Sequence, residues 1–308
     1  MEEVTEHVTQ LGHPTESGVG WASLIENESS FVLVDPCFGW RVLSEEEDGS
    51  RSYTAQFEAM LDLLIAREKP VRWIFLTHSH IDRVENLEFI NRSFTGYRGR
   101  KSTELLNYEL IVHHNSPLRS RVARRIGARD EITLDGRAYV FIHTPGHSGH
   151  RDDVSLFLPE DKVLFCGDLC QPQGPSYEAC DSVTPFQYFE FGDMAISSLE
   201  RLLRLDFDFL KSASGATYRG AAGRSALEVT LQVLQRLDEL ARELVRENPR
   251  ADSATICEWI YDTVCYERGF DAHRAYWRKT GHTVNGKTEY EVFDKPEIDN
   301  FVQKYRLS

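Results

Sequence analysis

The feature that most constrains this chain is a pair of histidines two residues apart, placed directly after an apolar run. Residues Val71 to Leu76 (VRWIFL) have the pattern of a buried strand, and THSHIDR at Thr77 to Arg83 follows at once. Two imidazoles at this spacing in a loop leaving a strand can point to one place, and Asp82 can reach the same cavity. Imidazole and carboxylate groups suit zinc, iron, nickel or manganese. A metal site therefore explains this segment better than a polar loop with solvated histidines.

Two further segments place ligand-type side chains at the ends of predicted strands. The run Tyr139 to His143 leads into TPGHSGH at Thr144 to His150, where Pro and Gly impose a tight turn beside His147. The run Lys162 to Cys166 ends in Gly-Asp, which presents the carboxylate of Asp168. Each segment alone is a weak signal, because a strand that ends in Gly-Asp is commonly only a turn. The three in this order, each closing a β-rich run, indicate one convergent metal site.

The order of these motifs resembles that of the metallo-β-lactamase superfamily of metal-dependent hydrolases, over roughly residues 15 to 225. Asp35, which ends the apolar run Phe31 to Asp35 before Pro36, is similar to an early aspartate of that family. The resemblance implies an α/β fold, a four-layer αββα sandwich with the site along one edge between the two sheets. It also implies that His78, His80 and His147 build one metal position and that Asp168 can bridge to a second. Asp82 would belong to that second position.

Two departures from the family affect the second metal position. The family pattern is His-x-His-x-Asp-His, but in this chain Arg83 stands in place of the last histidine. The family also has a late histidine, which the segment Ser212 to Ala216 lacks. Arginine keeps its charge in proteins and is not a ligand. We therefore expect one divalent transition metal per chain, zinc or iron, held by four residues: His78, His80, His147 and Asp168. His150 is the candidate replacement ligand for a second ion. His113 and His114, which end another strand, are expected to be structural or surface residues.

Arg83 has two interpretations that the sequence leaves open. Its guanidinium could lie near the second metal position, where it would hold Asp82 ionised, clamp a substrate carboxylate or stabilise an oxyanion. It could instead pair with Asp82 and seal a position that has lost its metal. Asp82, free of a second ion, could orient the attacking water or act as general base. Both residues are therefore candidate catalytic residues.

The predicted activity is hydrolysis of an ester, thioester or lactone of a small molecule, because an ion at such a site lowers the pKa of bound water towards about 7. The aromatic segment after Asp168 and the helical C-terminus look most like the lactonase and glyoxalase II-type thioesterase branches of the family. One alternative is a mononuclear non-haem iron dioxygenase that resembles the persulfide dioxygenases. Another is a non-catalytic binding protein on the same fold.

The sequence pattern changes near residue 225. Before it, short β-rich runs alternate with helical patterns such as Gln56 to Arg67. After it, leucines at helical spacing predict a long helix over Ser225 to Glu247, then a helix with Ser253 as its N-cap and a last one from Pro296. We predict a metallo-β-lactamase-like unit over residues 1–225. A helical extension over 226–308 would cover the site or form an interface, for example in a homodimer.

Composition and charge exclude some classes of function. The 35 Lys and Arg against 49 Asp and Glu give a formal charge of −14, which disfavours nucleic acid as a partner. No apolar stretch approaches the ~20 residues that span a bilayer, so no membrane association is expected. Met1 to Glu6 lacks the basic start of a signal peptide, and the six cysteines form no CxxC pair. These features predict a cytoplasmic protein with free thiols.

Overall fold

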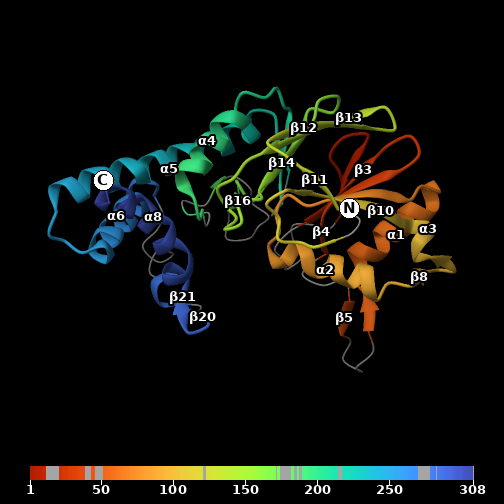
Figure 1. The fold of residues 1–308 in the computed structure, drawn as a ribbon, viewed down its shortest axis with the longest axis horizontal. Coiled ribbons are helices and arrows are strands. Elements are labelled where there is room, and N and C mark those ends of the chain that lie inside the picture. The colour runs from red at the N-terminus through yellow and green to blue at the C-terminus, as the bar shows by residue number, and fades with distance from the viewer. Residues whose placement is uncertain are drawn as a thin grey trace.

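The computed structural model describes residues 1–11, 21–38, 43–45, 51–120, 123–170, 172–173, 182–183, 186, 189–213, 217–269, 278–281 and 283–307. Two sheets pack face to face, and helices cover the outer face of each (Figure 1). This is the predicted four-layer αββα sandwich. Three hydrophobic cores separate the four layers, one between the sheets and one under each helical layer.

The first sheet has strand order β1-β2-β3-β4-β7-β10-β11. Successive side chains of a strand point to opposite faces. In β4, accordingly, Val32 and Val34 face the core between the sheets, whereas Phe31 and Leu33 face the helices. The strands are β1 (Glu2–Glu3), β2 (Val8–Gln10), β3 (Trp21–Glu26), β4 (Phe31–Phe38), β7 (Val71–Phe75), β10 (Leu106–His113) and β11 (Ala123–Ile126).

The second sheet has strand order β12-β13-β14-β15-β18-β19, with β15 and β18 parallel and its other neighbours antiparallel. Edge-to-face aromatic pairs join it to the first sheet, for example Phe75 and Phe141 with ring centroids 5.1 Å apart. The strands are β12 (Arg129–Leu134), β13 (Arg137–His143), β14 (Val154–Leu158), β15 (Val163–Gly167), β18 (Phe209–Ser212) and β19 (Thr217–Arg219).

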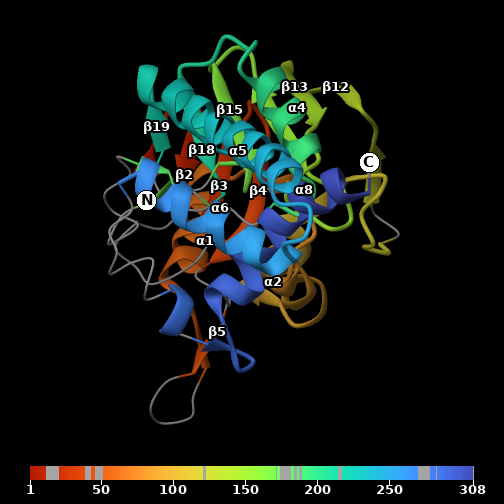
Figure 2. The same cartoon turned by 90° about the vertical axis from the view of Figure 1, so that its left-hand side faces the viewer.

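The helices divide between the two outer faces and a C-terminal arm. Helices α1 (Ala55–Arg67) and α2 (Ile81–Arg92) pack on the first sheet, and α4 (Gly192–Leu202) and the start of α5 (Ala221–Glu247) pack on the second. The rest of α5 forms an arm with α6 (Ser253–Glu267) and α8 (Lys295–Arg306) that extends away from the sandwich (Figures 1 and 2). Shorter elements are α3 (Ser102–Leu105), the π-helix η1 (Tyr290–Asp294) and four two-stranded ribbons: β5 (Leu43–Glu45) with β6 (Arg51–Tyr53), β8 (Gly96–Tyr97) with β9 (Arg100–Lys101), β16 (Pro172–Gln173) with β17 (Ser182–Val183), and β20 (Thr283–Val284) with β21 (Lys287–Thr288).

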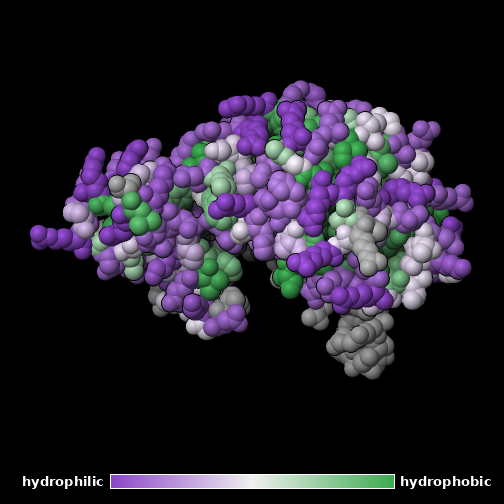
Figure 3. All heavy atoms as spheres, in the orientation of Figure 1, coloured by the Kyte–Doolittle hydropathy of each residue, from purple (hydrophilic) through white to green (hydrophobic). Residues whose placement is uncertain are grey.

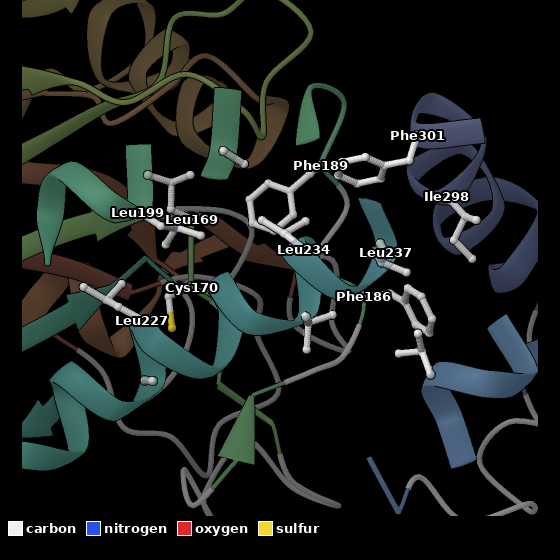
Figure 4. Packing of buried hydrophobic residues seen from close by; sticks show 14 of the residues in the cluster. Leu169, Cys170, Phe186, Phe189, Leu199, Leu227, Leu234, Leu237, Ile298 and Phe301 are labelled. Carbon is white, nitrogen blue, oxygen red and sulfur yellow. The ribbon is translucent and has the colours of Figure 1, made fainter. Parts of the chain in front are cut away.

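The arm and the second sheet share one hydrophobic core. Figure 4 shows Leu199 of α4, Leu227 and Leu234 of α5, and Ile298 and Phe301 of α8 within it. Side chains from both sides of the predicted 225/226 boundary therefore pack together, and the boundary itself stays a prediction. Hydrophilic residues cover most of the face in Figure 3, which is indented between the arm and the sandwich. Among the described helices none is long and apolar enough to cross a membrane.

Two expectations about local structure were wrong. Strand β4 does not end before Pro36 but continues to Phe38. Asp35 has a left-handed backbone (φ 43°), and the pairing of β4 with β3 shifts register between Val34 and Phe38. Pro36 lacks a backbone N–H, but it lies at this irregularity, where the regular hydrogen bonding between the strands is interrupted. The N-cap of α6 is Asp252 rather than Ser253, because its carboxylate accepts a hydrogen bond from the Thr255 backbone N–H at 2.8 Å.

Other expectations fall partly on residues outside the description. The five described cysteines are free thiols, as predicted: Cys37, Cys166, Cys170, Cys257 and Cys265. Cys180 lies outside the described residues, and so do Ser214 to Ala216 of the segment that lacks the late histidine.

Candidate metal centre

Four side chains from the segments that follow three strands meet at one edge of the sandwich. His78 follows β7, His80 directly precedes α2, His147 lies in the loop after β13, and Asp168 directly follows β15. One potential ligand atom from each lies within 4.8 Å of those of the other three. The structure therefore brings together the four residues that the sequence singles out. Their role as metal ligands stays a prediction.

The spacing of the donor atoms fits a single ion. The Nδ1 atom of His80 lies 3.1 Å from Nε2 of His147, which lies 3.5 Å from Oδ2 of Asp168. The Nε2 atom of His78 is 3.6 Å from the same oxygen. Tetrahedral zinc with bonds of about 2.0–2.1 Å requires donors separated by about 3.3 Å. Nε2 of His78 is also buried without a hydrogen-bond partner among the described residues, a property that it shares with Nε2 of His113.

A hydrogen-bond chain sets the tautomer of His78. The Thr77 hydroxyl donates to Oδ2 of Asp35 at 2.7 Å, and the Thr77 backbone N–H donates to Oδ1 at 2.8 Å. Because the hydroxyl proton is used in this way, the hydroxyl oxygen accepts from Nδ1–H of His78, 3.1 Å away. The lone pair of His78 is then on Nε2, which faces Asp168. Such outer hydrogen bonds commonly orient metal-binding histidines.

The loop that carries His147 is held by two buried aspartates. The carboxylate of Asp153 accepts from the backbone N–H of Gly146 at 3.2 Å and from that of Ser148 at 3.0 Å. The Ser148 hydroxyl donates to Asp152 at 2.6 Å. Hydrogen bonds to both neighbours of His147 fix the backbone from which its ring projects. Burial raises the pKa of Asp153 to about 8, against the opposing effect of the amide donors.

Helix α4 and the C-terminal arm pack against the same loop. A Cβ atom at Gly146 would lie 2.6 Å from Cβ and 2.7 Å from Cα of Ala195, so only glycine allows α4 to approach this closely. The Phe191 N–H donates to the Gly146 carbonyl at 2.9 Å. The next residue, Gly192, lies under the ring of Phe301 from α8. The arm therefore packs against residues 191–192, which in turn contact the His147 loop.

Burial and charge set the protonation states that a metal needs. Burial lowers the pKa of His78 well below its usual value, with further lowering by Arg83, and burial also lowers the pKa of His80. Burial favours the neutral form of Asp168, but the Arg83 guanidinium and the nearby histidines outweigh it and lower the pKa of that carboxyl. Neutral imidazoles and an ionised carboxylate are the metal-binding forms.

Arg83 is fully buried beside this group, which bears on both of its interpretations. Its Nη2 donates to Oδ1 of Asp168 at 2.7 Å, its Nη1 pairs with Oδ2 of Asp82, and its Nε lies 3.8 Å from Asp35. Burial opposes its charge, yet Asp168, Cys37 and Asp35 raise its pKa above the usual value. With no exposed surface, the guanidinium does not fit the role of substrate clamp. Pairing with Asp82 fits the arrangement.

Three other histidines form a group that we call the stacked cluster: His113, His114 and His143. The rings of His113 and His143 are parallel within 11°, with centroids 3.9 Å apart. Nε2 of His143 donates to the Arg151 carbonyl at 2.8 Å. The cluster is not among the described groups whose geometry suits a metal, and His113 is buried whereas His114 is exposed. We call the group of His78, His80, His147 and Asp168 the site cluster.

The role of His150 as a ligand of a second ion stays a prediction. Its side chain is exposed, and it is not part of the site cluster. The backbone N–H of His150 donates to the Ser148 hydroxyl at 3.2 Å. Sequence reasoning in turn missed Thr77, Asp152 and Asp153. The acidic pair directly before an apolar strand was a signal that could have identified the last two.

The family model described as the metallo-β-lactamase superfamily matches residues 16–175, just over half of the chain and including the whole site cluster. No curated protein matches the sequence. The solved structures to which the fold is similar share little sequence with it.

Three solved structures illustrate the likeness. A metallo-β-lactamase from Pontibacter korlensis is 15% identical with a TM-score of 0.51, and the match covers 76% of this chain and 97% of the other. Rubredoxin oxygen:oxidoreductase from Desulfovibrio gigas is 11% identical with a TM-score of 0.56, over 80% and 69%. The sec-alkyl sulfatase PisA1 is 15% identical with a TM-score of 0.58, over 98% of this chain and 49% of that one. Motifs, fold and family model agree, and the chain belongs to the metallo-β-lactamase superfamily.

Proposed function

We propose that this protein is a metal-dependent hydrolase that cleaves an ester, thioester or lactone of a small molecule. The observation that carries the proposal is the convergence of three imidazole nitrogens and one carboxylate oxygen of the site cluster on one point. A divalent transition ion held there would supply an acidified water, with a pKa of about 7, and a Lewis acid for the carbonyl oxygen.

The protein's own residues orient this site and leave one side of it accessible. His80 is the least buried member of the site cluster, and the neighbouring Ile81 is 69% exposed. We infer that the substrate approaches from the His80 side. Asp168 directs Oδ2 to the histidines while Arg83 holds Oδ1, so the carboxylate keeps one orientation. Because Arg83 also pairs with Asp82, we assign these two residues to positioning rather than to proton transfer.

A mononuclear iron dioxygenase is the second candidate, because nitrogen and oxygen donors in this arrangement suit iron as well as zinc. The same residues would hold either ion, so the donor set alone does not separate the two reactions. Oxygen dependence does separate them, since hydrolysis consumes water and the dioxygenase consumes O₂.

The test is to purify the protein without added metal or chelator, identify its metal by mass spectrometry, and assay ester, thioester and lactone panels with and without air. We expect about one zinc per chain and a hydrolytic activity that does not change when oxygen is removed. The His147→Ala variant should lose both metal and activity.

Other outcomes would overturn the hydrolase proposal. Iron together with oxygen uptake on a thiol or persulfide substrate would establish the dioxygenase. A folded protein without metal and without activity would indicate a binding protein. In that case His147→Ala should leave ligand binding intact.

A further inference from the structure

We propose that the Arg83 guanidinium replaces a second metal ion and is itself the resident cation of that position. The carboxylates around it act as its ligands: Asp35, Asp82 and Asp168. This inference rests on the proposed metal centre and deepens it, because it gives a physical reason for the expected binding of one ion and not two.

The groups around the guanidinium are of the kinds that bind transition metals. Oδ1 of Asp168 lies 2.7 Å from Nη2, and Oδ2 of Asp82 pairs with Nη1. The thiol of Cys37 is 3.5 Å from Nη1, and Oδ2 of Asp35 is 3.8 Å from Nε. Carboxylates and a thiol within reach of one point are a ligand set for zinc or iron. Here that point is taken by a planar cation that is part of the chain.

Asp168 connects the two cation positions. Its Oδ1 accepts the hydrogen bond from Arg83, and its Oδ2 lies 3.5 Å from Nε2 of His147 and 3.6 Å from Nε2 of His78. One carboxylate thus faces the proposed ion with one oxygen and the guanidinium with the other. A carboxylate between two metal ions would be divided in the same way.

Among the described residues, neither the packing nor the charge around Arg83 leaves room for a second ion. The Arg83 side chain is 0% exposed and packed among its partners, and its backbone is fixed in the first turn of α2 by a hydrogen bond to the His80 carbonyl at 3.0 Å. A divalent ion would have to displace the guanidinium or sit against its positive charge in a region of low dielectric.

The test is metal stoichiometry, which does not depend on knowing the substrate. Protein stripped of metal is saturated with Zn²⁺, freed of unbound metal and analysed by mass spectrometry for zinc per chain. We expect about one zinc in the wild type and about two in Arg83→His. That substitution removes the fixed charge, adds a nitrogen donor, and frees Asp82, Asp168 and Cys37. Zinc should also raise the melting temperature of Arg83→His by more than it raises that of the wild type.

Two control variants separate charge from the mere addition of a histidine. Arg83→Lys keeps the positive charge and should stay near one zinc. Arg92→His places a histidine on an exposed position of the same helix, where the native side chain is 76% exposed, and should also stay near one. If Arg83→His does not fold, Asp82→Asn serves instead. It should keep one zinc because Asp82 binds the guanidinium and not an ion.

The outcomes distinguish this inference from the proposed function. Two zinc ions in the wild type would overturn the role of Arg83 and leave the metal centre standing. One zinc in a folded Arg83→His would overturn it as well, as would loss of zinc from Asp82→Asn. No zinc in the wild type would overturn the metal centre itself, and the proposed hydrolase with it.

Discussion

The site cluster and the stacked cluster each hold three imidazoles at similar separations. Ring centroids lie 4.5–5.0 Å apart in the first and 3.9–6.5 Å apart in the second. In the site cluster the ring planes meet at 65–86°, so a nitrogen of each ring can point to a common centre. In the stacked cluster His113 and His143 lie face to face. One nitrogen of each bonds to the backbone: Nδ1 of His113 accepts from the Asn115 N–H and Nε2 of His143 donates to the Arg151 carbonyl.

The difference shows that proximity of histidines does not make a metal site. The site cluster adds the carboxylate of Asp168 and a chain of hydrogen bonds that leaves Nε2 of His78 with its lone pair. In the stacked cluster, Nδ1 of His113 accepts from the Asn115 N–H, so its proton is on Nε2. That nitrogen would have to lose its proton before it could bind an ion.

The largest expected effect is on metal affinity. His78→Asn removes one of four donors, and we expect zinc affinity to fall by at least about 100-fold, since changing even an outer partner of a ligand costs about 10–100-fold. His113→Asn, the matched change in the stacked cluster, should leave zinc affinity within about twofold. Competition with a chromogenic chelator measures both. Equal losses in the two variants would contradict the distinction between the clusters.

The next effect is on stability and concerns the loops that support the two clusters. Asp153→Ala leaves the buried N–H groups of Gly146 and Ser148 without their acceptor, and the free energy of unfolding should fall by about 2–3 kcal/mol. Asn115→Ala removes an exposed 3.0 Å hydrogen bond to the Arg151 carbonyl near the stacked cluster, and should cost less than about 1 kcal/mol. Urea denaturation of the metal-free proteins gives both values. A larger loss in Asn115→Ala would reverse the comparison.

The smallest effect is a pH dependence that belongs to the stacked cluster. Burial, helped by His143 and His114, lowers the pKa of His113 from 6.5 to about 4. The unfolded chain therefore binds a proton first, so stability is fully present above pH 6.5 and is lost as the pH falls towards 4. His113→Phe should reduce the drop in melting temperature between pH 7 and pH 5 in the presence of chelator.

The His113→Phe variant should retain part of this pH dependence. His78 and His80 also have lowered pKa values, so acid destabilises the metal-free site cluster in the same direction. The difference between wild type and His113→Phe isolates the stacked cluster. An unchanged slope would show that His113 does not titrate as its burial requires.

The layered architecture and the members of the site cluster could be predicted from the sequence. The cluster residues could be identified because each follows closely after an apolar run. The contacts that orient them could not. Asp35 and Thr77 are distant in sequence and meet only through the pairing of β4 with β7. The carboxylate of Asp153 accepts hydrogen bonds from backbone N–H groups. Because every residue except proline has such a group, the residue types of the loop do not reveal these bonds.

The role of Arg83 illustrates the same limit. The residue types allow either a substrate clamp or an internal ion pair, and the choice depends on which way a long side chain turns from α2. Its burial beneath Cys37 and Asp35 is set by the packing of α2 against β4, a tertiary property. The irregular course of β4 at Pro36 depends in the same way on its neighbour β3.

The contact between Phe301 of α8 and Gly192 has a consequence for how the protein matures on the ribosome. His147 is synthesised 154 residues before Phe301, a delay of about 8–30 s at ordinary rates of translation. During that interval the segment beside the His147 loop lacks the helix that packs over it. A nascent chain would thus expose its histidines to cellular metals before their surroundings are complete, and the order of synthesis makes α8 the last support to arrive.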